Sequence, residues 1–262
     1  MRILLTNDDG IDAPGFSILE TLARNLSDDI WVVAPAEEQS GKGHSISLTQ
    51  PLRYNKRGER RFAVSGTPTD AVMLALRKIM GDDQPDLILS GVNRGANMAE
   101  DLTYSGTVSA AMEGALAGIR SIALSQSQGN HREGLGDKFT FAAAQAWGER
   151  VLRPLLSAPI AANSLFNVNF PALAPDSVKG IRIVAQGFRD AGRFSFVTNR
   201  DPRGYNYHWM ALGEARQTPG HATDLEAIAE GYIAVTPLHL DMTDHRALTP
   251  LSACFDAADI KA

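Results

Sequence analysis

One stretch decides the fold class: Arg2-Ile3-Leu4-Leu5-Thr6-Asn7-Asp8-Asp9-Gly10. A short apolar run that ends in Asn, Asp and Gly is typical of a buried strand meeting a turn. In an open parallel sheet, ligands bind just outside the carboxyl ends of the strands. Asp8 and Asp9 would repel each other there unless a cation or a shared proton offsets their charge. A divalent cation is the simpler solution, and hard oxygen ligands favour Mg²⁺ or Mn²⁺.

A tight Asp-Gly hairpin turn is the alternative interpretation of the same residues. The residues after Gly10 do not alternate as a second strand would, which favours a strand followed by a helix. Strands are also expected at 30–34, 87–89, 121–125 and 232–236, and helices at 16–26, 67–80, 106–118, roughly 137–156 and from Asp224 onward. Strands joined by helices predict right-handed crossovers and an α/β fold with a mostly parallel sheet covered on both faces.

The composition limits the functional classes. The 262 residues are 44% hydrophobic and 21% charged, enough for one large domain with a substantial core and no evident linker. A net charge of −5 argues against coating of nucleic acid, which needs a basic stripe. There is no apolar stretch of membrane-spanning length and no leader pattern, and the single cysteine, Cys254, cannot form an internal disulfide. We therefore expect a cytoplasmic protein that binds neither nucleic acid nor membrane.

Residues 186–222 differ from the rest of the chain. Six of the eighteen aromatic residues fall within 22 positions, among Gly, Arg and Asn: Phe188, Phe194, Phe196, Tyr205, Tyr207 and Trp209. The pattern predicts a β-hairpin arm with aromatic faces. Such an arm is either an interface or a small satellite cluster packed on the parent domain, and the composition alone leaves both open.

Four polar segments are expected at the carboxyl edge of the sheet. They are Asp8-Asp9-Gly10, the loop Gln39–Ser45, the loop Ser90–Asn97, and Tyr104-Ser105-Gly106-Thr107 at the start of a helix. Each has an ordinary explanation, such as an Asx turn or a helix cap. Their joint arrival at strand ends favours a site instead. The helix start suits a phosphate, because free amides and the positive helix end lie there and Gly106 allows close approach.

The sequence lacks the motifs of several other enzyme classes that act on phosphates, nucleotides or esters. The chain has no G-x-x-x-x-G-K-[ST], no complete G-x-G-x-x-G and no G-x-S-x-G motif. Two positions after Asp8 stands Gly10, so the Asp-x-Asp of aspartyl-phosphate enzymes is missing. Water activated by a metal ion is left as the nucleophile, with Asp8 or Asp9 as a possible proton acceptor. His44 is a candidate for protonating the leaving group, although a loop histidine that only bonds locally is an equal alternative.

The chain resembles the SurE family in motifs that span nearly its whole length. The matching stretches are Met1–Gly10, Val33–Pro35, Gly43–Ile46, Gly66–Asp70, Ser90–Gly95 with Asn97, Tyr104–Val108, Gly231-Tyr232 and Thr236–Leu238. The resemblance implies one SurE-like domain over residues 1–262, with a Rossmann-like three-layer core and a C-terminal hairpin extension used for dimer or tetramer contacts.

The same resemblance implies the site. Asp8, Asp9, Ser40 and Asn93 would bind one divalent ion per subunit, Mg²⁺ or Mn²⁺, and Asn97, Ser105, Gly106 and Thr107 would line the phosphate pocket. The implied activity is hydrolysis of nucleoside 5′- and 3′-monophosphates to nucleoside and phosphate. A phosphatase for a non-nucleotide ester and a nucleotide-binding protein without turnover are the alternatives.

Overall fold

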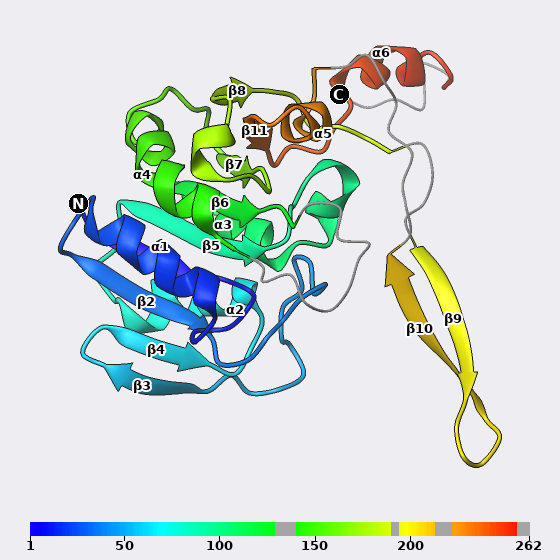
Figure 1. Cartoon of the computed structure of the whole chain (residues 1–262), viewed down its shortest axis with the longest axis horizontal. Coiled ribbons are helices and arrows are strands. Elements are labelled where there is room, and N and C mark those ends of the chain that lie inside the picture. Colours follow the sequence, from blue (N-terminus) through cyan, green and yellow to red (C-terminus); the bar gives the residue numbers. More distant parts are fainter. Residues whose placement is uncertain (129–139, 190–193, 213–221, 256–262) are drawn as a thin grey trace.

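The fold is a three-layer α/β sandwich with one projecting arm (Figure 1). The structure is a computed structural model and describes residues 1–128, 140–189, 194–212 and 222–255. Within these ranges no helix has the length and apolar character needed to cross a membrane.

The middle layer is a sheet of nine strands in the described part of the chain. They are β1 (Ile3–Thr6), β2 (Ile30–Pro35), β3 (Tyr54–Gly58), β4 (Arg61–Val64), β5 (Leu87–Arg94), β6 (Arg120–Gln126), β7 (Ser164–Phe170), β8 (Ile181–Ile183) and β11 (Ile233–His239). Their order is β3-β4-β2-β1-β5-β6-β7-β11-β8. Only the pairs β3–β4 and β7–β11 are antiparallel. The sheet is therefore mostly parallel, as predicted.

The outer layers are helices: α1 (Pro14–Arg24), α2 (Pro68–Leu74), α3 (Gly106–Leu116), α4 (Ala142–Leu155), α5 (Asp224–Ala229) and α6 (His245–Ser252). Along β1, Ile3 and Leu5 pack into the cluster that α1 and α4 cover, whereas Leu4 packs toward α2 on the opposite face. This alternation has the two-residue period of a strand, and both faces are apolar because both are covered. α3 and α5 lie on the same face as α2.

Local signals fix where these helices begin. Pro14 and Pro68 occupy first-turn positions, where a missing N–H has no cost. Thr67 and Asp70 form a capping box, and the Ser105 hydroxyl caps α3 by accepting from the Val108 amide at 3.1 Å.

The strand order reverses direction at β1. The chain passes from β1 to β2 on one side and later returns to place β5 on the other side of β1. A crevice opens at such a switch point, outside the carboxyl ends of the two strands. Asp8 and Asp9 follow β1, and Asn93 lies near the end of β5, so the candidate ligands meet at this point.

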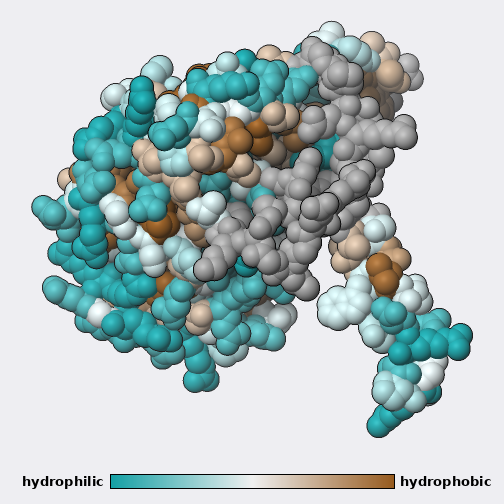
Figure 2. All heavy atoms as spheres, viewed as in Figure 1, coloured by the Kyte–Doolittle hydropathy of each residue, from teal (hydrophilic) through white to brown (hydrophobic). Residues whose placement is uncertain are grey.

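The arm consists of β9 (Phe194–Arg200) and β10 (Asn206–Leu212), paired antiparallel. It extends away from the body in Figure 1. Side chains on both strands are exposed, among them Phe196 at 63% and Trp209 at 65%. Figure 2 shows a hydrophilic outer end and hydrophobic atoms nearer the body. The prediction of a hairpin is confirmed, and its aromatic residues Phe196, Tyr207 and Trp209 are exposed.

Most predicted elements are present, with shifted ends. The helix expected at 137–156 is α4, and the first three expected positions lie outside the described residues, as do 190–193 and 213–221 of the expected arm. The strand expected at 232–236 is β11 and continues to His239. Strands β3, β4, β7 and β8 were not expected.

Candidate active site

Asp8 lines the crevice at the switch point and is buried, with 4% of its surface exposed. Its Oδ1 accepts a hydrogen bond from the Thr107 hydroxyl at the start of α3. Burial raises the pKa of Asp8 from 3.8 to about 6; the Thr107 hydrogen bond acts in the opposite direction, and the charge of Asp9 adds to the rise. A carboxylate held this way favours a nearby cation, because a cation would offset the desolvated negative charge.

Asp9 sits beside it, closer to solvent. Its Oδ2 accepts from the backbone N–H of Arg94 at 3.1 Å, which joins the β1 loop to the end of β5. Burial raises the pKa of Asp9, and the Glu38 carboxylate contributes to the rise. The two adjacent aspartates are therefore both destabilised as anions by their surroundings.

Ser40, on the loop after β2, and Asn93, near the end of β5, complete the predicted ligand set. The Asn93 amide nitrogen donates to the Gly95 carbonyl at 2.9 Å, so the side-chain oxygen is the group that can face a cation. The Ser40 hydroxyl donates to Glu38 Oε1 at 2.9 Å, which leaves its lone pairs available. The register between β5 and β6 shifts between Ser90 and Asn93, an irregularity of the kind that re-aims a side chain near a site.

The donor set fits a hard divalent cation. It comprises two carboxylates, one amide oxygen and one hydroxyl, all oxygen ligands suited to Mg²⁺ or Mn²⁺. In the described ranges no group of three or more His, Cys, Asp or Glu side chains could hold a metal. A site here would thus depend on the Ser and Asn oxygens and on water beyond its two carboxylates.

The predicted phosphate-binding residues divide into two groups. Asn97 and Ser105 line the same cavity as Asp8, Ser40 and Asn93. Gly106 lies behind the wall: a Cβ there would come 2.8 Å from Asp8 Cβ. The Thr107 side chain is fully buried, and its hydroxyl bonds to Asp8. In this structure Thr107 therefore orients the carboxylate from behind.

Asn97 is held in place by a buried polar network. Its backbone N–H donates to Asn169 Oδ1 at 2.9 Å, and its side-chain nitrogen donates to the Ser125 hydroxyl at 2.8 Å. The side-chain nitrogens of Asn167 and Asn169 on β7 both donate to the Asn97 carbonyl at 2.9 Å. The loop after β5 is thereby fixed to the adjoining strand ends.

The cavity itself has a volume of about 530 Å³. Five of its lining residues were missed by the sequence reasoning: Met98, Asp101, Ser127, Gln128 and Arg189. They come from the 3₁₀ turn Ala99–Thr103 and its approach, from the end of β6, and from the segment before the arm. Such residues carry no local motif, and only the folded chain brings them to one wall.

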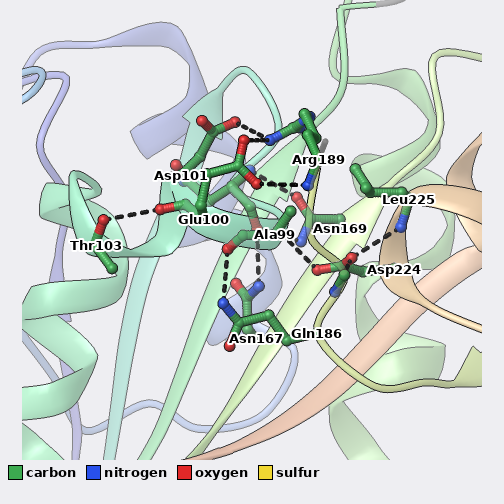
Figure 3. Close-up of polar contacts among 12 residues, drawn as sticks. Ala99, Glu100, Asp101, Thr103, Asn167, Asn169, Gln186, Arg189, Asp224 and Leu225 are labelled. Atoms are coloured by element: carbon green, nitrogen blue, oxygen red, sulfur yellow. Dashed lines mark hydrogen bonds and ion pairs between the residues drawn. The ribbon is translucent and has the colours of Figure 1, made fainter. Parts of the chain in front are cut away.

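Arg189 ties the segment before the arm to this wall (Figure 3). Its side chain is 9% exposed, and Nη1 lies 3.0 Å from Glu100 Oε1 and 3.2 Å from Asp101 Oδ2. Its backbone N–H also donates to Glu100 Oε2 at 3.2 Å. Partial burial acts to raise the pKa of Glu100, but a hydrogen bond from its own backbone and the contacts with Arg189 lower it overall.

Asp224 forms a second tie on the same wall. Its fully buried carboxylate accepts three backbone N–H groups, from Ala99 at 3.0 Å and from Gly187 and Leu225 at 2.9 Å each. Gln186 adds a hydrogen bond to the Ala99 carbonyl at 2.9 Å. Both segments from which the arm departs are thus bonded to the cavity wall (Figure 3).

Comparison with known proteins identifies the family of this chain. The family model described as "Survival protein SurE" matches residues 3–193. The curated relatives named "5'-nucleotidase SurE" include one from Rhizorhabdus wittichii, 62% identical over 97% of this chain and 100% of the relative. Another, from Erythrobacter litoralis, is 58% identical over 98% of this chain and all of the relative.

A solved structure shows the same architecture. The crystal structure of the SurE protein from Aquifex aeolicus matches with a TM-score of 0.81 and 37% identity, covering 98% of this chain and 100% of that one. The match to the family model and the full-length relatives lead to the same conclusion: this chain belongs to the SurE family.

Proposed function

We propose that this protein is a metal-dependent 5′-nucleotidase that hydrolyses nucleoside 5′-monophosphates, and also 3′-monophosphates, to nucleoside and phosphate. The observation that carries the proposal is the pair of adjacent, desolvated aspartates at a switch point, beside a cavity that also meets a helix N-terminus. The names of relatives at 58–62% identity support the enzyme class.

In this proposal Asp8, Asp9, Ser40 and Asn93 hold the cation. When bound, it would supply Lewis acidity and positive charge for a phosphoryl group and lower the pKa of a coordinated water. Thr107 keeps Asp8 oriented, and its hydrogen bond stabilises the ionised carboxylate.

The start of α3 serves the phosphoryl group. Ser105 lies on the cavity wall, and the first amides of α3 are at the positive end of the helix. Preorganised donors of this kind stabilise the charge that develops on phosphoryl oxygens during in-line displacement. Asn97 forms the neighbouring wall, held rigid by β7.

Removal of divalent metal is expected to reduce phosphate release from nucleoside monophosphates by more than about a hundredfold, because the cation supplies several kcal/mol of transition-state stabilisation. The measurement is phosphate release after EDTA treatment and desalting, with Mg²⁺ or Mn²⁺ added back. Sugar phosphates are assayed in parallel. Undiminished turnover without metal would refute metal dependence, preference for sugar phosphates would favour a non-nucleotide ester, and tight nucleotide binding without release would indicate a binding protein.

We also propose that the arm joins copies of this chain into a homodimer or homotetramer. The support is its exposed apolar surface, which includes Phe196, Val197, Trp209 and Met210, each more than half exposed. Changing Phe196 and Trp209 together to Ser is expected to lower the mass in solution, as measured by light scattering. A control change of the polar residues Thr198 and Arg200, both on β9, to Ser should leave the mass unaltered. If the mass is the same for all three proteins, the arm is not the interface.

A further inference from the structure

The predicted ligand Ser40 lies on a loop that is anchored at its flanks, where the Thr67 hydroxyl also donates to the Ser45 carbonyl at 2.7 Å. We call residues 37–45 the Ser40 loop. On one side the Gln39 amide donates to the Asp8 carbonyl at 2.8 Å, and on the other the Gly43 amide donates to the Tyr104 carbonyl at 3.0 Å. Between them Gly41 has φ +73°, and a Cβ there would meet no atom within 4 Å. Backbone of this kind is permissive, so the position of Ser40 depends on what holds the flanks of the loop.

A side-chain contact adds to the backbone anchor at Gly43 on one flank. His44 Nε2 lies 2.7 Å from Glu113 Oε1, with the two side chains 37% and 18% exposed. Glu113 belongs to α3, the helix whose first turn carries Ser105 and Thr107. The contact thus fixes the Ser40 loop to the element that orients Asp8 and meets the phosphate end of the cavity.

The His44 side chain does not line the cavity of the candidate active site. It is absent from the residues that line the cavity beside Asp8, and its Nε2 faces the Glu113 carboxylate. A group that protonates a leaving oxygen must come within hydrogen-bond reach of it, directly or through one water. The earlier hypothesis of His44 as leaving-group acid therefore lacks geometric support, and a different role fits the contact.

We propose that His44 is a positioning residue, whose contact with Glu113 holds the Ser40 loop against α3 and so presents the Ser40 hydroxyl to the cation. The inference rests on the proposed metal-dependent function. An ordinary surface ion pair would contribute little and would not affect the site. The distinguishing consequence is that loss of either partner weakens metal binding, although neither residue is a ligand.

The test measures Mn²⁺ affinity by electron paramagnetic resonance of free Mn²⁺ in the full-length protein, without substrate. His44→Ala, Glu113→Gln and the double variant are compared with the unaltered chain. Glu230→Gln is the matched control, because Glu230 pairs with Arg182 at 2.6 Å among residues that do not line the cavity. We expect each single variant to raise the Mn²⁺ dissociation constant roughly three- to tenfold. The double variant should raise it no further than the single variants do, and the control should leave it unchanged.

Activity then separates positioning from acid catalysis. At saturating Mn²⁺, His44→Ala should regain nearly full kcat on both a nucleoside monophosphate and p-nitrophenyl phosphate, whose good leaving group needs no acid. Unchanged Mn²⁺ affinity in both single variants would overturn the inference while leaving the proposed function standing. A kcat loss confined to the nucleotide would overturn it in favour of acid catalysis. Failure of the unaltered protein to bind Mn²⁺ would overturn the proposed function and this inference together.

Discussion

Replacement of Asp8 by asparagine is expected to reduce phosphate release about a thousandfold, equivalent to roughly 4 kcal/mol of lost transition-state stabilisation. The substitution keeps the shape of the side chain and an oxygen that can accept from Thr107, so the fold should persist. What it removes is the negative charge that, in our proposal, holds the cation. The measurement is kcat/KM for a nucleoside monophosphate at saturating Mg²⁺.

The same variant is expected to be more stable than the unaltered protein when metal is absent. Burial raises the pKa of Asp8 from its ordinary value of 3.8 to about 6, so the folded state binds the Asp8 proton more tightly than the unfolded state does. Below pH 3.8 both states are protonated, and Asp8 carries no penalty. As pH rises toward 6, stability falls, by an amount on the order of 3 kcal/mol that persists above it. Asparagine does not titrate and escapes this loss.

Urea unfolding in EDTA at about pH 4 and pH 7.5 measures this difference. We expect the free energy of unfolding of Asp8→Asn to exceed that of the unaltered protein at the higher pH. The difference between the two should become small at the lower pH. Asp12→Asn, an exposed aspartate in the same loop, is the control and should change neither activity nor stability. A variant that keeps full activity, or that is less stable at pH 7.5, would contradict the role given to Asp8.

Replacement of Gly106 by alanine is the second change with a large expected effect. Alanine is normally preferred over glycine in a helix by about 1 kcal/mol. Here its Cβ would lie 2.8 Å from Asp8 Cβ, closer than packed atoms tolerate, and 3.0 Å from Pro68 Cγ, tighter than most Cβ contacts. Either α3 or the Asp8 side chain must shift, and overpacking of this kind costs about 1–3 kcal/mol. We expect lower stability and roughly a hundredfold lower kcat/KM, because Asp8 is displaced.

Thermal unfolding and steady-state kinetics of Gly106→Ala provide the measurement. Gly58→Ala in β3 is the matched control, because its Cβ would meet only Arg61 Cβ at an ordinary 3.4 Å. If Gly106→Ala is as stable and as active as the Gly58 variant, then Asp8 is not confined by the start of α3.

The sequence predicted the core of this fold because its signals are local. The apolar run before Asp8, the Thr67 cap and the small-residue helix after Ser105 each carry a periodicity or capping pattern, and all three are present. The SurE family assignment is confirmed by the family model and by relatives that cover the whole chain. The metal and phosphate roles of the individual residues remain predictions.

Other elements gave no readable signal. β3 is exposed along its whole length, so it lacks the apolar alternation of a half-buried strand. β7 does alternate, but its polar positions Asn167 and Asn169 are fully buried, where they hold Asn97. A polar position in an alternating strand would ordinarily be assigned to solvent. Arg189 reaches the cavity only because its ion pairs connect segments nearly ninety positions apart.

The three backbone hydrogen bonds to Asp224 have a consequence for engineering the arm. This one carboxylate secures Ala99, which adjoins the cavity-lining Met98, together with Gly187 and Leu225, so a change to the segment around Gly187 or Asp224 would disturb the cavity wall. A chimera that imports a relative's arm therefore needs its splice points on the arm side of Arg189 and of Asp224. Grafts with splice points on the arm side of these two residues would exchange the arm alone. Grafts with splice points beyond them would also replace residues bonded to the cavity wall.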